Sequence, residues 1–257
     1  MKKSLLIVGS FLLIQAVLGL LLELLATNFP HIIKVGASTY LATLLLSSIL
    51  VFFATIKICK KSPIEPFLWK LHTKGGGFIV LLSLITTLPI IVFSNSLIEI
   101  LNLPDLLADS FSDMADTPLA LWVMALSAPL AEEICFRYGI INSLLEERRL
   151  SNVSIIIVSA MIFGIIHFNP SQMVGATIVG LYLGWLFVVT KSLWPALLCH
   201  ILNNAIAVTM LRNFPSDFMI ADLLPNHNMI YLVAAVSLIA VGLSLYLLNK
   251  TVKSFCK

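Results

Sequence analysis

Eight apolar stretches, most of them long enough to cross a membrane as a helix, constrain the fold of this chain more than any other feature. They cover approximately residues 4–26, 38–57, 77–100, 118–144, 153–168, 172–190, 193–211 and 229–248, and the fifth is the shortest. A bilayer core of about 30 Å is crossed by roughly 20 apolar residues in a helix. Hydrophobic residues make up 59% of the chain and charged residues 11%, against about 25% in an average soluble domain. The sequence therefore predicts an all-α, polytopic membrane bundle of about eight transmembrane helices.

The lysines and arginines orient this bundle in the membrane. With eight spans both termini lie on one side, and thirteen of the sixteen basic residues fall on that side. Only Lys34 and Arg212 fall on the other side, and Arg137 lies inside a span. Because cytoplasmic segments carry the excess of positive charge, we expect both termini in the cytoplasm and the protein in the cell membrane, or in the cytoplasmic membrane if the source is a prokaryote. The thirteen residues are Lys2, Lys3, Lys57, Lys60, Lys61, Lys70, Lys74, Arg148, Arg149, Lys191, Lys250, Lys253 and Lys257.

Composition also argues against several other kinds of protein. The net charge is only +3 and the basic residues form no long run, so no nucleic-acid partner is expected. The cysteines include no C-x-x-C pair, which disfavours a zinc knuckle or a disulfide framework and favours small buried side chains. They are Cys59, Cys135, Cys199 and Cys256. The outer loop 102–117 is acidic with interspersed apolar residues, which predicts a short helix on the membrane surface.

Charged residues inside the fourth span are the first indication of chemistry. An ionisable residue at the centre of a membrane helix costs at least about 2.5–3.5 kcal/mol, so it is a candidate functional residue. Glu23 and Glu99 lie near the outer ends of their spans, where the cost is lower, and we expect them to be interfacial. In the fourth span, Glu133 and Arg137 are four residues apart on one helical face and can form an ion pair. Glu132 is rotated by about 100° from that face, so we expect it to be the carboxylate that takes part in chemistry.

Two further spans carry polar residues at helical spacing. Phe163 and His167 are four residues apart near the end of the fifth span, which places an aromatic ring one turn from an imidazole. His200 and Asn204 have the same spacing in the seventh span and share one face of an otherwise apolar helix. Taken alone, the histidine could be an ordinary core residue and the His–Asn pair an interhelical hydrogen bond. The remaining histidines fall in loops.

Together, three helices supply two glutamates, two histidines, an arginine and an asparagine. Amide hydrolysis needs a base, a group that positions water, and donors for an oxyanion, and this inventory provides all of them. It also provides a His₂Glu ligand set for zinc, formed by Glu132, His167 and His200. The chain has no H-E-x-x-H motif of zinc proteases, no G-x-S-x-G motif of serine hydrolases and no aspartate at the centre of a span, so these other classes of protease are disfavoured. Proton-coupled transport stays open as an alternative.

The order Glu-Glu-x-x-x-Arg (132–137), Phe-x-x-x-His (163–167) and His-x-x-x-Asn (200–204) resembles the CAAX protease and bacteriocin-processing (CPBP, or Abi) family. These intramembrane endopeptidases include the Ras-converting prenyl protease, and the resemblance covers about residues 118–210. It implies catalytic roles for Glu132, Glu133, Arg137, His167, His200 and Asn204. Glu132 would activate the hydrolytic water, and His167 would hold that water or a metal ion. The Glu–Arg pair would support them, and the third motif would orient the water or stabilise the oxyanion.

The sequence thus predicts three successive segments: membrane spans in 1–117, a catalytic core in 118–211, and a loop, span and tail in 212–257. The expected activity is intramembrane hydrolysis of a peptide or membrane-protein substrate, with zinc or with water activated by glutamate alone. A non-proteolytic immunity or regulatory protein and a proton-coupled transporter are the alternatives. The substrate and the oligomeric state stay open. In this topology His167 lies further out than Glu132, unless the fifth span is strongly tilted or continues past Phe168 and Asn169.

Overall fold

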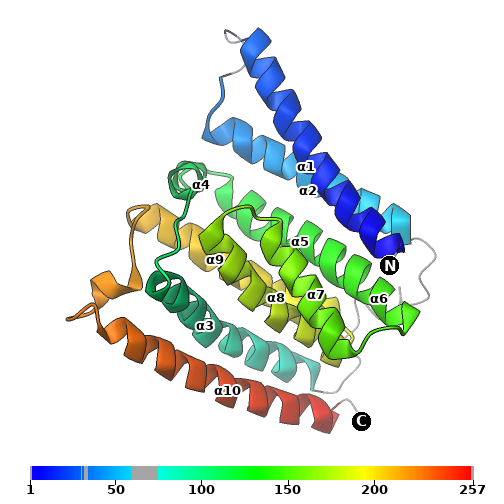
Figure 1. Ribbon diagram of the computed structural model, residues 1–257, viewed down its shortest axis with the longest axis vertical. Helices are drawn as coiled ribbons and strands as arrows, with labels where there is room; N and C mark the ends of the chain where they lie inside the picture. Colours follow the sequence, from blue (N-terminus) through cyan, green and yellow to red (C-terminus); the bar gives the residue numbers. More distant parts are fainter. Residues whose placement is uncertain (1, 30, 32–33, 60–74, 256–257) are drawn as a thin grey trace. The chain divides into compact units, whose positions relative to one another are not determined.

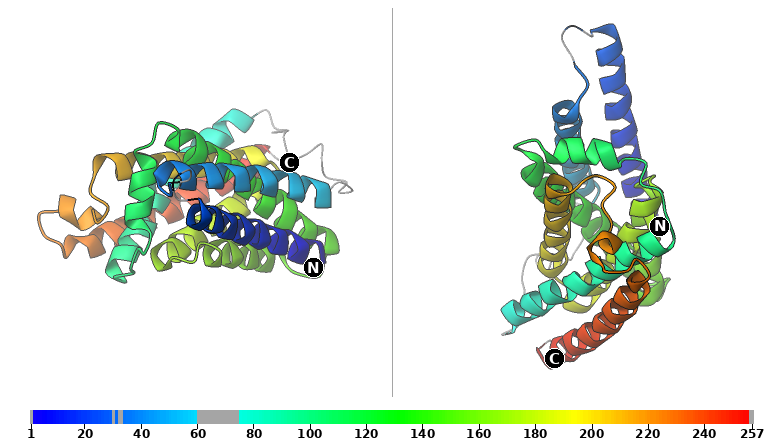
Figure 2. Two further views of the ribbon diagram at one scale, coloured as in Figure 1. Left: turned by 90° about the horizontal axis from the view of Figure 1, so that it is seen from above. Right: turned by 90° about the vertical axis from the view of Figure 1, so that its left-hand side faces the viewer.

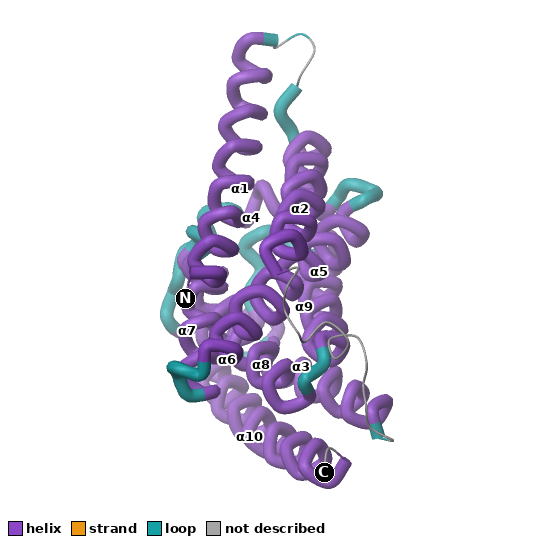
Figure 3. Tube along the Cα trace, turned by 90° about the vertical axis from the view of Figure 1, so that its right-hand side faces the viewer, coloured by secondary structure: helices purple, strands orange, loops and turns teal. Residues whose placement is uncertain are grey.

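The computed structural model describes residues 2–29, 31, 34–59 and 75–255, and within these ranges every regular element is a helix (Figure 1; Figure 3). Six of the described helices are long and apolar enough to cross a membrane. The protein is therefore an all-α, multi-pass membrane protein, which confirms the predicted fold class. The six helices are α1 (Lys2–Asn28), α2 (Ala37–Cys59), α3 (Gly76–Ile100), α8 (Pro170–Thr190), α9 (Leu193–Asn213) and α10 (Met229–Phe255).

The fourth and fifth predicted spans coincide with helical segments that are not among these six long helices. The fourth coincides with a continuous helical run of π-helical and α-helical pieces, and the fifth with α7 (Asn152–Ile165), which has only 14 residues. A total of eight spans thus stays a prediction. The pieces of the run are η2 (Leu121–Ser127), α5 (Ala128–Glu133), η3 (Ile134–Ile141) and α6 (Asn142–Glu147). The acidic loop 102–117 contains the predicted short helix, α4 (Ala108–Ala115), and a later loop contains the 3₁₀ helix η4 (Ile220–Leu223).

The chain forms two compact units, each assembled from separated stretches of sequence. The first unit consists of Met1–Pro63, Ala108–Ser151 and Asn204–Ser216. The second unit consists of Ile64–Leu107, Asn152–Asn203 and Asp217–Lys257. The three segments predicted from the sequence follow one another along the chain, whereas these units interleave. Helix α9 contributes to both units, since the boundary falls between Asn203 and Asn204.

In the first unit, α1 and α2 run side by side and pack against η3 (Figure 2). The close approach occurs at Gly139 of η3, where an added Cβ would lie 2.9 Å from Thr55 Cγ2 and 3.0 Å from Ile7 Cδ1. The rings of Phe11 and Phe136 meet edge to face nearby, 6.1 Å apart. A second contact region joins α2, α4, η2 and the end of α9 through apolar side chains. They are Leu41, Met114, Ala115, Ala120, Val123, Met124 and Val208.

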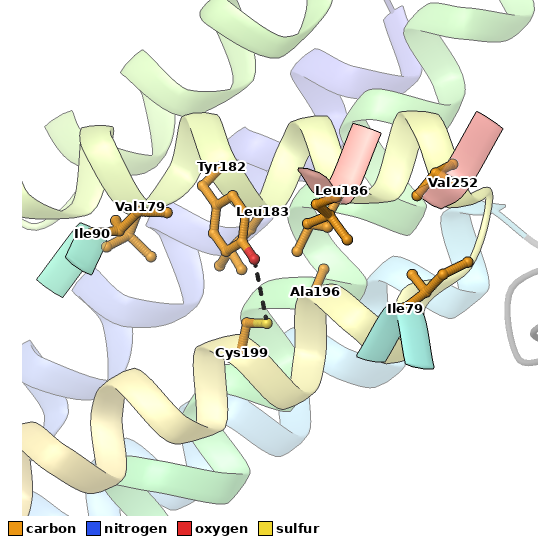
Figure 4. Packing of buried hydrophobic residues seen from close by; sticks show 10 residues of the cluster. Ile79, Ile90, Val179, Tyr182, Leu183, Leu186, Ala196, Cys199 and Val252 are labelled. Atoms are coloured by element: carbon orange, nitrogen blue, oxygen red, sulfur yellow. Dashed lines mark hydrogen bonds between the residues drawn. The ribbon is translucent and has the colours of Figure 1, made fainter. Parts of the chain in front are cut away.

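In the second unit, α8 provides the centre of the core (Figure 4). The buried hydroxyl of Tyr182 donates to the carbonyl oxygen of Ser83 on α3 at 2.6 Å and lies 3.9 Å from the sulfur of Cys199 on α9. Hydrogen bonding of this hydroxyl removes the cost of burying it. Cys59, Cys135 and Cys199 are all buried, as predicted, and Cys256 lies outside the described residues.

Glu99, predicted to be interfacial, has a specific structural partner in the second unit. Its carboxylate accepts hydrogen bonds from the backbone N–H groups of Ile220 and Ala221, at the start of η4. These N–H groups have no partner within the short helix, and a negative charge is favourable at a helix N-terminus. Glu99 therefore fastens the loop before α10 to the end of α3.

We expect a tag at either terminus to be reached only from the cytoplasm, because the basic residues are so unevenly distributed. Of those residues, Lys60, Lys61, Lys70, Lys74 and Lys257 lie outside the described residues, as does His72. Labelling of terminal cysteine tags with an impermeant maleimide, in intact and in permeabilised cells, checks this orientation. A C-terminal tag labelled in intact cells would contradict the eight-span topology.

Candidate active site

Glu132 and Glu133 end a short α-helix, α5, that has π-helical segments on both sides. Pro129 accounts for the first of them, because a proline has no N–H and its ring clashes with the carbonyl four residues earlier. The helix widens there, and the N–H of Ala128 donates five residues back to Val123. After the glutamates, the N–H of Asn142 likewise reaches back to the carbonyl of Arg137. Such π-helical turns are rare and occur frequently at functional sites.

Asn204 compensates for a hydrogen bond that Pro129 cannot make. In a π-helix the carbonyl of Met124 would accept from the N–H of residue 129, but residue 129 is a proline and has no N–H. The N–H of Ala128, which would be the donor in an α-helix, is directed to Val123. The side-chain amide of Asn204 on α9 donates to this Met124 carbonyl at 3.0 Å. Asn204 thus connects α9 to the segment that precedes the glutamates, an interaction that its spacing from His200 does not reveal.

The predicted ion pair between Glu133 and Arg137 is confirmed. Nη1 of Arg137 lies 2.9 Å from Oε1 of Glu133, and the two side chains are 2% and 0% exposed. Glu132, one residue earlier, is only half-buried. The arginine therefore neutralises the fully buried carboxylate, whereas the residue next to it, Glu132, stays partly exposed.

The two histidines of the second unit pack against the same aromatic ring. The imidazole of His167 meets the ring of Phe163 edge to face, with centroids 5.1 Å apart. The imidazole of His200, on α9, meets that ring at 5.7 Å and 89°. The contact between Phe163 and His167 follows from their spacing, but the contact with His200 is a tertiary one that the sequence does not indicate. Phe163 therefore holds both imidazoles in defined orientations.

A hydrogen bond fixes the tautomer of His167. Its Nδ1 lies 2.7 Å from the backbone carbonyl oxygen of Phe163. A carbonyl oxygen can only accept, so Nδ1 carries the proton and the lone pair of the neutral ring is on Nε2. This arrangement is the usual one for a histidine that ligates a metal ion or accepts a hydrogen bond from water through Nε2.

His167 lies in a turn and not in the helix. Helix α7 ends at Ile165, and Phe168 has a positive φ of 50°, so of the two alternatives left open by the sequence the helix does not take the one that continues past Phe168. Asn169 begins α8 instead: its side chain accepts from the N–H of Leu106 at 3.0 Å and donates to Asp105 at 2.7 Å. The Asn-Pro sequence at 169–170 was the signal for this boundary, since Pro is favoured at the first position of a helix.

Gly164 sets the distance between α7 and α8 just before His167. A Cβ at this position would lie 2.5 Å from the carbonyl oxygen of Met173 and closer still to the hydroxyl of Thr177. We expect Gly164→Ala to force the helices apart, to displace His167 and to lower the thermal stability of the purified protein. Gly77→Ala on α3, where an added Cβ meets nothing within 4 Å, is the matched control and should not lower the melting temperature. An unchanged melting temperature in Gly164→Ala would contradict the close packing.

The six candidate residues thus form two groups with their own local geometry. Glu132, Glu133, Arg137 and Asn204 belong to the first unit, and His167 and His200 to the second. Within the described parts of the chain, no three side chains of His, Cys, Asp or Glu lie together as metal ligands. The zinc ligands predicted from the sequence are divided between the two units, so zinc binding stays a prediction.

Comparison with known proteins shows what the part of the chain with the three motifs is similar to. Residues 114–206, which contain all three motifs, match the family described as "Type II CAAX prenyl endopeptidase Rce1-like". Over 93 residues the chain is 31% identical to a Bacillus subtilis (strain 168) protein named "Putative membrane peptidase YdiL". The alignment covers 36% of this chain and 37% of that protein, little more than a third of either. No solved structure matches the chain. For this part of the chain, the predicted relationship to the CAAX protease and bacteriocin-processing family is confirmed.

Proposed function

We propose that this protein is an intramembrane endopeptidase that hydrolyses a peptide bond of a membrane-associated protein or peptide. The observation that carries the proposal is the family match over residues 114–206, which encloses every residue of the three motifs. Local chemistry supports it in each unit. A half-buried Glu132 adjoins a neutralised Glu–Arg pair, and a histidine presents the lone pair of Nε2.

In the proposed reaction, Glu132 removes a proton from water while the water oxygen attacks the carbonyl carbon of the scissile bond. In this proposal, which follows the order of the family motifs and not the packing of the two units, His167 orients this water through Nε2, because Nδ1 is bonded to the carbonyl of Phe163. His200, with Asn204 one turn further along α9, provides polar groups for the oxyanion. Glu132 then gives this proton to the departing amine. One water molecule is therefore consumed for each peptide bond that is broken. The buried Glu133–Arg137 pair fixes the helix that carries Glu132.

The proposed substrates are polypeptides that reach the membrane, and four classes are candidates: a prenylated C-terminus, a leader peptide, a peptide pheromone precursor and a membrane protein. The name of the matched family, which mentions a prenyl endopeptidase, makes the prenylated C-terminus the first class to test.

Cleavage of these four classes by purified protein in bilayers, followed by mass spectrometry of the products, tests the function. We expect one class to be cleaved by the wild type, His167→Ala to abolish turnover, and His200→Ala to slow it by about 10²–10³-fold, as for loss of one oxyanion donor. His227→Ala, an exposed loop histidine, is the matched control. The same assay with and without a chelator decides whether zinc is required. A transporter or a regulatory protein would yield no product, and equal rates for His167→Ala and wild type would overturn the proposal.

A further inference from the structure

The second unit contains a groove between α3, α8 and α10 that none of the proposed catalytic residues lines. Its volume is about 520 Å³, within the range of about 300–1,000 Å³ for sites that bind small molecules. It extends along α10 from Leu238 to Asn249, with Trp185 of α8 and Phe93 of α3 on its other sides. Leu238 is 52% exposed and Tyr246 65%, so the groove is open to the surroundings of the helices.

One end of the groove is polar and the rest is apolar. Asn249 and Tyr246 line the groove toward the C-terminal end of α10, while aliphatic and aromatic side chains line the remainder. Tyr182 is at the base of the groove, where its hydroxyl is bonded to Ser83 and its ring stacks on Trp185 with centroids 6.4 Å apart. These two rings therefore form one wall of the groove.

The polar end of the groove coincides with the basic end of the unit. Lys253 is seven residues after Tyr246 and four after Asn249, so it continues their stripe along α10 by one turn. Figure 4 shows Leu186 of α8 and Val252 of α10 toward the same end of the core, away from Val179. Lys191, which follows α8, therefore lies toward this end too. Lys191 and Lys253 are exposed.

The length of the groove fits one leaflet of a membrane. The eleven-residue step from Leu238 to Asn249 corresponds to about 16 Å at 1.5 Å per helical residue. Half of a hydrocarbon core of about 30 Å is about 15 Å. An acyl chain lying along α10 would therefore reach the middle of the bilayer, while its phosphate lies at the level of Lys253. The distribution of basic residues predicts that this leaflet is the cytoplasmic one, whose surface is negatively charged.

We propose that this groove is a binding site for an anionic phospholipid, with one acyl chain between α8 and α10 and the phosphate at Asn249 and Lys253. A second copy of the chain would fit less well, because contacts between membrane helices favour small residues and the wall here is mostly aromatic and aliphatic. The site is independent of the proposed peptidase activity, since it is lined by none of the catalytic candidates.

Quenching of Trp185 fluorescence by brominated acyl chains tests the proposal. The full-length protein is placed in phosphatidylcholine bilayers that contain brominated phosphatidylglycerol or, in parallel, brominated phosphatidylcholine. The contribution of Trp185 is the difference between the wild type and Trp185→Phe. We expect phosphatidylglycerol to quench Trp185 at lower mole fraction than phosphatidylcholine. Lys253→Gln should reduce this preference about fivefold, the effect of one lysine near an anionic lipid surface.

A second variant fills the groove directly. An added Cβ at Gly242 meets nothing within 4 Å, so Gly242→Phe can place its ring in the groove and should remove the quenching of Trp185 by both lipids. Lys57→Gln, an exposed lysine at the end of α2, and Gly19→Phe, an equally open glycine of α1, are matched controls and should behave like the wild type. Equal quenching by the two lipids with no effect of Lys253→Gln would overturn the proposal. Disulfide cross-linking between copies through Gly242→Cys would overturn it as well, by showing that another protein copy covers the groove.

Discussion

Glu132→Gln should abolish peptide hydrolysis and leave the yield of folded protein unchanged. The substitution keeps the shape of the side chain but removes the base that takes the proton from water. A positioned general base contributes typically about 10²–10⁴-fold to a rate, so the remaining cleavage should fall to the limit of detection. Because Glu132 is half-buried and the buried partner of Arg137 is Glu133, the substitution leaves the ion pair intact. Turnover and thermal stability, measured on the same monodisperse preparation, check both parts of this prediction.

Glu146→Gln is the matched control for this experiment. Glu146 belongs to the same unit and forms a partly exposed ion pair with Lys3, with 3.4 Å between Nζ and Oε2. Loss of such a pair has little effect on stability, so this variant should cleave at the wild-type rate. If the glutamate at 132 served only to support the fold, Glu132→Gln would either cleave normally or fail to fold. Cleavage at the wild-type rate by well-folded Glu132→Gln would rule out its assignment as the base.

Features that depend on neighbours along the chain could be predicted from the sequence. Hydropathy identified the long helices, because a membrane span must satisfy its backbone within one continuous segment. The pairing of Glu133 with Arg137 and the contact of Phe163 with His167 followed from the four-residue spacing, which is a property of the helix itself. Three ordered motifs were enough to indicate the family that residues 114–206 match.

Features that depend on distant residues could not be predicted in this way. The contact of His200 with Phe163 requires α9 to bring this imidazole to a side chain of α7, and hydropathy contains no information about which spans meet. The bond from Asn204 to Met124 depends on a carbonyl released by Pro129, which becomes recognisable only with the π-helical geometry of η2. The end of α7 was misplaced because Ile166 and Phe168 are apolar and continue the hydropathy pattern, whereas the backbone turns there.

Removal of Arg137 should have the largest effect on the stability of the protein, and the cause of this destabilisation can be determined by experiment. Arg137→Ala leaves the carboxylate of Glu133, which is 0% exposed, without its charge partner, and breaking a buried pair in this way costs about 3–5 kcal/mol. We expect a markedly lower melting temperature in detergent and a lower folded yield. Arg137→Lys should recover little of this loss, because a single ammonium group does not reproduce the planar, multi-donor guanidinium. Arg149→Ala, at an exposed loop position, is the control and should melt like the wild type.

A second substitution shows whether Arg137→Ala destabilises the protein by leaving the charge of Glu133 buried without its partner or by removing packing contacts. Replacing both partners of a buried ion pair is often nearly neutral, whereas replacing one is not, because the cost comes from the charge that stays buried alone. Glu133→Gln introduced into Arg137→Ala should therefore raise the melting temperature again, although it removes one more native group. If the missing volume of the arginine were the cause, the double variant would be no more stable than Arg137→Ala. A melting temperature of the single variant equal to that of the wild type would mean that the Glu133–Arg137 pair does not support the helix that carries Glu132.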